Sequence, residues 1–194
     1  MPRWSAALAA VLFLSACATA PDMPADRAPA ALDPDRVRFE LNGRIGVQNG
    51  DEGMSGLLRG LHEPETDQLW FSSPLGSSVA MLVRDENGVE LVSGLGPPRR
   101  AANAEVLTRE ALGWDLPLSG LEYWILGRPA PATGTERIDR DPANGRLTRL
   151  VQHGWSIDFR RYLDTEWGAL PALIHLEYGS LQIRLVVDRW DLQR

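Results

Sequence analysis

Leu181-Gln182-Ile183-Arg184-Leu185-Val186-Val187-Asp188 carries the clearest structural signal in this 194-residue chain. From Leu181 to Asp188, apolar side chains occupy every second position and polar ones fill most positions between. A period of two predicts a β-strand with one face buried and one face in water. Gly179-Ser180, directly ahead of it, predicts a tight turn back to the apolar stretch 173–178. The C-terminal region is therefore expected to end in a β-hairpin.

Similar stretches occur on both sides of a central region. Turn signals separate them, such as Asn49-Gly50-Asp51, Asn87-Gly88 and His153-Gly154. Short strands joined by tight turns predict antiparallel pairing. The remaining predicted strands are 37–47, 54–62, 69–71, 79–83, 89–91, 147–152 and 155–161.

The central region follows a different period. Apolar residues recur at helical spacing within 101–112, and Gly113 is the expected end of that helix. A second short helix, ended by Gly127, places Leu121, Trp124 and Ile125 on one face. A sheet of about ten or eleven strands curls, and two apolar helices can cover its concave side. The sequence thus predicts a mainly β (α+β) domain with a curved antiparallel sheet.

The N-terminus has the form of a bacterial lipoprotein signal. Leu14-Ser15-Ala16-Cys17 ends an apolar run, 6–14, that is too short to span a bilayer, and Arg3 precedes it. This predicts a signal peptide at 1–16, acylation of Cys17 and a tether at 17–36 before a domain at 37–194. An ordinary signal peptide with an incidental cysteine, or a short membrane anchor, is the alternative. Cys17 is the only cysteine and cannot form an intramolecular disulfide.

Composition excludes several functional classes. The chain has 20 basic and 26 acidic residues, and every basic residue is arginine. Cleavage before Cys17 would leave 19 basic against 26 acidic residues, a net charge of −7. An acidic protein without a basic stripe is not expected to bind nucleic acid, and a chain without lysine has neither a Schiff-base nor a phosphate-loop lysine. The three histidines, His62, His153 and His175, lack metal-type spacing, so no catalytic residue, metal or cofactor is predicted.

An ordered set of short motifs resembles the LolB family. The family consists of outer-membrane lipoproteins that accept other lipoproteins from a periplasmic carrier, LolA, and place them in the outer membrane. The resemblance covers about residues 37–192 and rests on the ordered set rather than on any one motif. The motifs are Gly43-Arg44-Ile45-Gly46, Ser73-Pro74-Leu75-Gly76, Leu116-Pro117, Tyr123-Trp124-Ile125-Leu126-Gly127, Gln152-His153-Gly154-Trp155, Leu170-Pro171 and Asp188-Arg189-Trp190.

The resemblance implies an unclosed antiparallel β-barrel with a helical lid over an apolar cavity. It also implies a monomer anchored by lipid to the periplasmic face of the outer membrane, with a LolA-like carrier and acylated client lipoproteins as partners. Ala18, rather than Asp, after the acylated cysteine agrees with outer-membrane sorting. The candidates for lining the cavity are Phe39, Leu41, Ile45, Leu69, Phe71, Met81, Leu107, Leu121, Trp124, Ile125, Ile157, Phe159, Ile183 and Leu185. A solid core that buries the same residues without a cavity is the alternative.

Leu75 stands apart from this apolar set. Ser73-Pro74-Leu75-Gly76 predicts a type I turn, whose third side chain tends to point outward. The resemblance implies that Leu75 is the leucine that enters the target membrane; a leucine folded back onto the sheet is the alternative.

These observations lead to a lipoprotein acceptor and insertase that is not an enzyme. One rival is a lipid- or glycolipid-binding periplasmic lipoprotein of similar fold, which needs only the cavity. The other is a lipid-tethered hydrolase, which needs a converging serine, histidine and carboxylate that the sequence does not assemble.

Overall fold

The computed structural model describes residues 32–94, 96–112, 118–131 and 134–193. Cys17 and the rest of the signal and tether up to residue 31 lie outside the described residues, as do Gly113 and the motif Leu116-Pro117. The predictions made for them stay predictions.

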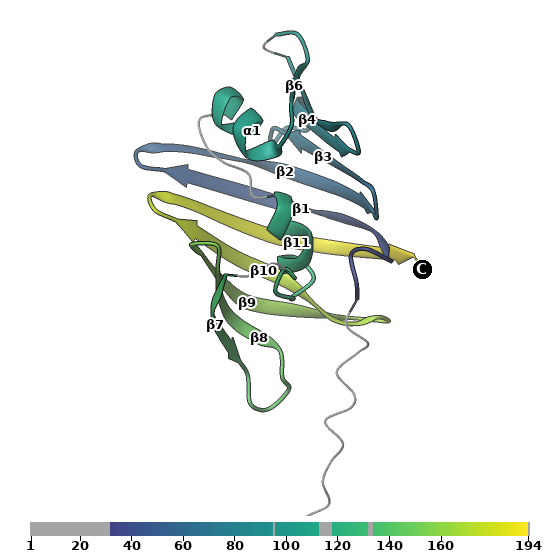
Figure 1. The fold of residues 1–194 in the computed structure, drawn as a ribbon, viewed down its shortest axis with the longest axis vertical. Helices are drawn as coiled ribbons and strands as arrows, with labels where there is room; N and C mark the ends of the chain where they lie inside the picture. Colours follow the sequence, from purple (N-terminus) through teal and green to yellow (C-terminus); the bar gives the residue numbers. More distant parts are fainter. Residues whose placement is uncertain (1–31, 95, 113–117, 132–133, 194) are drawn as a thin grey trace, which may run out of the picture.

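The described chain forms one eleven-stranded sheet in which every strand runs antiparallel to its neighbours. The strand order is β6-β5-β4-β3-β2-β1-β11-β10-β9-β8-β7, so β6 and β7 are the two free edges and the sheet does not close. The predicted fold, a curved and unclosed antiparallel sheet with few helices, is confirmed (Figure 1). The strands are β1 Arg38–Asn49, β2 Glu52–Glu63, β3 Thr66–Ser72, β4 Ser78–Asp85, β5 Gly88–Ser93, β6 Arg99–Ala101, β7 Thr135–Arg140, β8 Leu147–Gln152, β9 Trp155–Thr165, β10 Gly168–Tyr178 and β11 Leu181–Gln193.

The two ends of the chain pair in the middle of the sheet. β1 lies against β11, with Ile45 opposite Leu185 and Val47 opposite Ile183, so the alternating apolar series of both strands share the inner face. A bulge follows Asn42, and an added Cβ at Gly43 would lie 2.1 Å from the backbone oxygen of Val186. Only glycine permits the strands to approach this closely there, which explains why the first motif begins with one.

Two short edge strands were not predicted. β6 has three residues, and β7, Thr135–Arg140, is almost entirely exposed and shows no apolar alternation. A strand that buries neither face carries no period-two signal, and charged residues are what edge strands commonly use to resist further pairing. Sequence periodicity therefore misses both edges of the sheet.

The face of β4 was predicted wrongly. The inward residues are Ala80 and Leu82, which lie opposite Phe71 and Leu69 of β3. Met81 lies opposite Trp70 and half-buried on the outer face. β4 is apolar at five successive positions, so its own period cannot choose a face, and pairing with β3 decides it.

Two helices of the described chain cover the inner face. α1, Ala104–Leu112, packs against β5 and β6, and the Asn103 side chain caps it by accepting a hydrogen bond from the Val106 amide at 3.0 Å. α2, Leu118–Trp124, crosses the middle of the sheet in front of β1 and β11 (Figure 1). Neither described helix is long and apolar enough to cross a membrane.

Gly127 ends the second helical segment, as predicted. Its φ is +73°, and the amides of Gly127 and Arg128 donate to the carbonyls of Trp124 and Tyr123 at 2.9 and 3.0 Å. This pair of bonds is a Schellman motif, in which a left-handed glycine satisfies the last carbonyls of the helix.

Candidate functional site

Two small apolar cavities lie between α2 and the inner face of the sheet. The first, of about 20 Å³, is lined entirely by apolar residues, and the second, of about 30 Å³, adjoins it. Each has room for about one or two waters, so neither holds an acyl chain while α2 is in this position. Leu69 and Leu121 line both. The first is also lined by Ile45, Leu58, Phe71, Leu176, Ile183 and Leu185, and the second by Phe39, Leu41, Gly60, Leu61, His62, Asp67, Leu118, Glu122 and Ile125.

The predicted cavity residues separate into three groups. Those that line the two cavities are Phe39, Leu41, Ile45, Leu69, Phe71, Leu121, Ile125, Ile183 and Leu185. Leu107, Trp124, Ile157 and Phe159 are buried in the same hydrophobic core but line neither cavity. Met81 faces outward. The structure thus brings most of the candidates together under α2.

Polar contacts hold α2 to both halves of the sheet. On one side, the Arg84 guanidinium of β4 donates to Glu122 Oε2 at 2.7 Å. On the other, Trp124 Nε1 donates to Gln152 Oε1 of β8 at 2.9 Å. Gln152 is fully buried and also exchanges two hydrogen bonds of 2.9 Å with the backbone of Ala130, just after the helix. α2 is therefore a lid fastened on both sides, and we call it the lid below.

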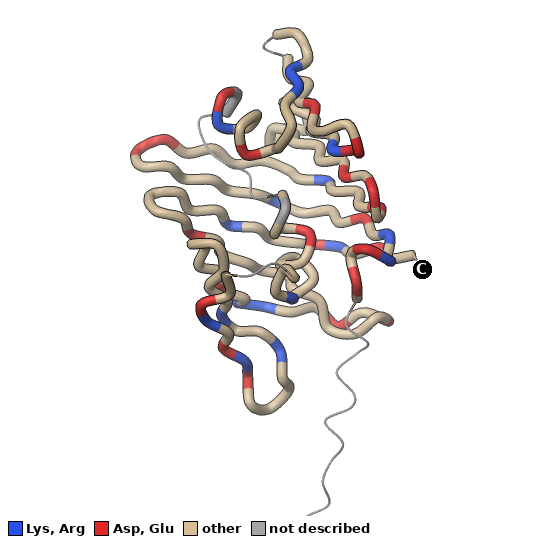
Figure 2. The backbone as a smooth tube through the Cα atoms, viewed as in Figure 1, with Lys and Arg blue, Asp and Glu red and all other residues tan. Residues whose placement is uncertain are grey.

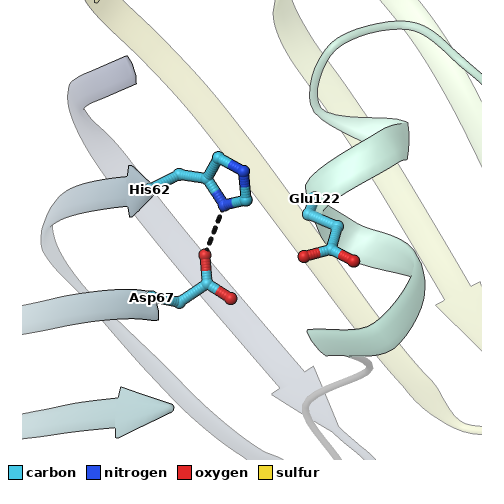
Figure 3. Close-up of side chains that lie close together, drawn as sticks. All are labelled: His62, Asp67 and Glu122. Carbon is cyan, nitrogen blue, oxygen red and sulfur yellow. Dashed lines mark hydrogen bonds and ion pairs between the residues drawn. The ribbon is translucent and has the colours of Figure 1, made fainter. Parts of the chain in front are cut away.

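A buried polar cluster forms one wall of the second cavity. His62 is the last residue but one of β2, Asp67 is the second residue of β3, and Glu122 faces them from the lid (Figure 3). His62 Nδ1 lies 2.6 Å from Asp67 Oδ1, and Nε2 lies 2.9 Å from the carbonyl oxygen of Pro34. Because a carbonyl and a carboxylate both accept, both ring nitrogens donate and the ring is an imidazolium. Its face stacks on Phe39 at 4.6 Å between centroids.

The charges of this cluster balance. The three ligand atoms of His62, Asp67 and Glu122 lie within 4.8 Å of one another, a spacing that could suit a metal ion. However, Arg84 forms ion pairs with both carboxylates and supplies the positive charge that a metal would bring. Two cations and two anions in contact form a closed ion-pair network, and we assign no metal to it.

The pKa values of His62 and Glu122 are both raised above their ordinary values in this cluster. Burial alone lowers the pKa of His62, but hydrogen bonds to Asp67 and to the Pro34 carbonyl, and the charge of Asp67, outweigh it and raise the pKa above the ordinary 6.5. Burial raises the pKa of Glu122, and Arg84 opposes that shift. A raised folded-state pKa means that the protonated form is favoured by folding.

We expect the free energy of unfolding to fall with rising pH because of His62. Its contribution is complete below the unfolded pKa of about 6.5 and is lost as pH rises through the higher folded pKa. Chemical denaturation of the native protein and of His62→Gln from about pH 5 to about pH 9 measures it. The difference between the two curves should narrow with rising pH. A constant difference would contradict the imidazolium.

A larger groove lies on the opposite, outer face of the sheet. It has a volume of about 330 Å³ and includes Asn42, Leu57, Arg59, Trp70 and Asp188 among its lining residues. It is open to solvent, and its charged groups are already paired, Arg59 with Glu40 and Asp188 with Arg44. This groove is larger than the cavities under the lid, but those cavities offer the apolar walls that a hydrocarbon chain needs.

Leu75 lies at the tip of the β3–β4 hairpin. The Gly76 amide donates to the Ser73 carbonyl at 2.8 Å, which closes the predicted four-residue turn, and Gly76 has a φ of +84°. The Leu75 side chain is 94% exposed, far more than any other exposed large apolar residue of the described chain. Asp67 and Leu75 lie at opposite ends of β3, so the tip and the buried cluster are at opposite ends of this strand.

The comparisons with known proteins agree with this geometry. A family profile described as "Outer membrane lipoprotein LolB" matches residues 37–190. An outer-membrane lipoprotein LolB of Thiobacillus denitrificans is 40% identical over 178 residues, which is 92% of this chain and 91% of that protein. The chain belongs to the LolB family. A LolB of Azoarcus is 35% identical over 98% of this chain and 96% of that protein.

Membership in the LolB family makes this chain a lipid-anchored outer-membrane lipoprotein with the acceptor role of the family. Among solved structures, the fold is similar to a LolA superfamily protein from Nitrosomonas europaea, with a TM-score of 0.52, 9% sequence identity and coverage of 81% of this chain and 86% of that one. At this identity the likeness concerns the fold alone.

The motifs that carried the LolB resemblance contact one another in space. Arg44 of the first motif pairs with Asp188 of the last at 2.7 Å. Trp190 Nε1 donates to the Pro171 carbonyl at 3.0 Å, and Trp124 reaches Gln152. These six motif residues therefore join strands or fasten the lid.

The sequence interpretation missed the polar residues that hold the lid, above all Arg84. For His62, no partner was predicted from the sequence. One signal existed: His62 follows Leu58 and Gly60 at every second position of β2, which places it on the inner face. Its hydrogen-bond partners are Asp67 of β3 and the Pro34 carbonyl before β1, and no spacing along the chain reveals them.

Proposed function

We propose that this LolB-family protein takes acylated client lipoproteins from a LolA-like periplasmic carrier and inserts them into the outer membrane. The observation that carries the proposal is the continuous apolar surface beneath the lid, to which both halves of the sheet contribute. Lifting the lid would open this surface to a hydrocarbon chain. The role requires no catalytic step, in keeping with a lipoprotein-localisation protein.

Energetics make a relay of apolar cavities sufficient. Burying a hydrocarbon chain is worth about 0.8 kcal/mol per CH2 group, so a long acyl chain is worth on the order of 10 kcal/mol. An acylated client therefore cannot cross water alone, and each transfer needs only a somewhat better apolar site. The bilayer is the final and most favourable site, so the transfer needs no nucleotide.

A hydrolase is not favoured by the groups that the structure describes. His62 and Asp67 do form a histidine–carboxylate pair. In a serine hydrolase the second ring nitrogen of such a histidine accepts the serine proton. Here His62 Nε2 donates to the Pro34 carbonyl in the buried cluster, so it cannot act as that base.

Transfer from a loaded carrier tests the proposal. Carrier bearing an acylated client is mixed with the protein, and the client is followed by affinity capture and then by flotation with liposomes. We expect the acylated client to move to this protein and then to the lipid. A client that lacks acyl chains is the control and should not be retained. Equal retention of the two clients would overturn the proposal and favour a general protein-binding surface.

The tether is long enough to let the Leu75 tip face the membrane that holds the chain. Fifteen residues, 17–31, separate the acylated end from the described chain, and at full extension they span about 50 Å. β3, whose far end carries the tip, has seven residues, or about 23 Å. The domain can therefore turn its Leu75 end to the bilayer without detaching.

We expect Cys17→Ala to remove the lipid and to leave the folded domain unchanged. The reason is that Cys17 lies fifteen residues before the described chain and contributes only an attachment point. Metabolic labelling with palmitate should mark the native chain and not the variant, while circular dichroism of the two domains should coincide. Palmitate incorporation at the native level in Cys17→Ala would contradict the assignment.

A further inference from the structure

The segment Leu32–Val37, which we call the strap, joins the tether to the first strand. Its turn is closed by the amides of Arg36 and Val37, which donate to the Asp33 carbonyl at 2.9 and 3.0 Å. Leu32 and Val37 are buried at its two ends, 9% and 7% exposed. The strap is therefore an ordered part of the domain that packs into its core.

The strap is fastened to the lid. The Tyr123 hydroxyl donates to Asp35 Oδ1 at 3.2 Å, and Tyr123 belongs to α2. Arg128, directly after the C-terminal glycine of the lid, donates to the Leu32 carbonyl and lies 3.9 Å from Asp33. These contacts join the strap to the last turn of the lid and to the residue that follows Gly127.

The strap is also fastened to the sheet. His62 Nε2 donates to the Pro34 carbonyl, and His62 is held by Asp67. The same network reaches the lid through Arg84 and Glu122. The strap thus connects the lid and the sheet at one end of the second cavity, beside Phe39 and His62.

The lid must move before the cavities can admit a chain, since together they hold only a few waters. Each contact that must break before the lid lifts adds to the free energy of opening the lid. Acidic and basic residues are spread over both halves of the sheet (Figure 2). The strap contacts Tyr123 in the last turn of the lid, Arg128 just after it and His62 on the sheet. The strap bonds to this turn through Asp35 and to the buried cluster through the Pro34 carbonyl.

We propose that the strap is an intramolecular latch: its contacts with Tyr123, Arg128 and His62 hold α2 over the apolar cavities, and its release lets the lid lift. The proposal rests on the proposed function in one respect: the opened lid is taken to admit an acyl chain. Because the tether joins the chain at Leu32, the latch lies where membrane attachment meets the domain. The strap, at which the tether enters the domain, then takes part in opening and closing the lid.

Hydrogen exchange of the full chain in phosphatidylcholine vesicles tests the latch. The key variant is Tyr123→Phe with Arg128→Gln, which removes both side-chain bonds from the lid to the strap and leaves the buried cluster intact. We expect the amides of Ile125, Gly127 and Arg128 to exchange about tenfold faster, while the amides of β1 and β11 keep their native rates. The single variant Tyr123→Phe should shift the same amides by a smaller factor.

Arg44→Gln is the matched control. Arg44 forms a bidentate pair with Asp188 between the two central strands, away from both strap and lid, and its loss should leave exchange in the lid unchanged. If the double variant accelerated amide exchange equally in the lid and in the strands, or left exchange in the lid at its native rate, the latch proposal would be overturned. Client transfer is not measured here, so a failed latch leaves the proposed function standing and a failed transfer leaves the latch standing.

Discussion

Leu121→Asp should weaken the acceptance of acylated clients sharply while leaving the sheet folded. Leu121 is only partly buried, so the domain should tolerate an aspartate there. Leu121 also lines both cavities, so the aspartate places a charge beside the space that an acyl chain would occupy. An unpaired polar group in an apolar site costs about 2–3 kcal/mol. The apparent affinity for acylated client should therefore fall by about 30- to 100-fold.

The matched control is Val106→Asp in α1, at a position that is 43% exposed. It introduces the same charge on the other helix and should leave acceptance within about twofold of native. Titration of the protein against carrier loaded with a fluorescent client measures both variants. Similar losses in Leu121→Asp and Val106→Asp would show that added negative charge, and not the cavity, reduces acceptance.

Leu75→Glu should separate acceptance from delivery. The side chain is almost fully exposed, so the free energy of unfolding should change by no more than about 0.5 kcal/mol. Burial of one leucine in lipid is worth about 1.5–3 kcal/mol, which cannot hold the domain on a bilayer but can orient a tethered one. We expect Leu75→Glu to accept client at the native rate and to deliver it to liposomes about ten- to a hundredfold more slowly.

Two further variants sharpen that test. Leu75→Phe keeps an apolar tip and should preserve delivery. Leu57→Glu makes the same substitution on the outer face, where Leu57 is 41% exposed, and should also preserve it. Stopped-flow transfer to liposomes gives the rates. Native delivery by Leu75→Glu would make Leu75 an ordinary turn residue, and a loss of acceptance would place the tip in the carrier-docking surface.

The fold could be predicted where a strand has one buried face. The alternation in 181–188 defines β11, and its turn to 173–178 defines β10. Period two fails at β4, where residues 79–83 are all apolar and the pairing with Leu69 and Phe71 of β3 turns Ala80 and Leu82 inward. It also fails at β7, which buries neither face.

Of the residues beneath the lid, only the apolar ones were predicted from the sequence. An inward alternating position such as Ile183 is visible in the sequence, and so is a leucine in a turn. The lid fastening depends on side chains that meet across the fold: Arg84 and Glu122 are 38 residues apart, and Tyr123 and Asp35 are 88 apart. The size of a cavity depends on how the lid sits on the sheet, which no spacing along the chain determines.

The most direct measurement is the location of a client's acyl chain after handover. A lipoprotein carrying a photoreactive fatty acid is loaded on the carrier, transferred to this protein and irradiated, and mass spectrometry then identifies the labelled peptides. The account predicts labels on lid and inner-face residues, above all Leu121 and Ile183. Labels on the outer-face groove at Leu57 and Trp70, or a transferred client that labels no inner-face residue, would contradict it.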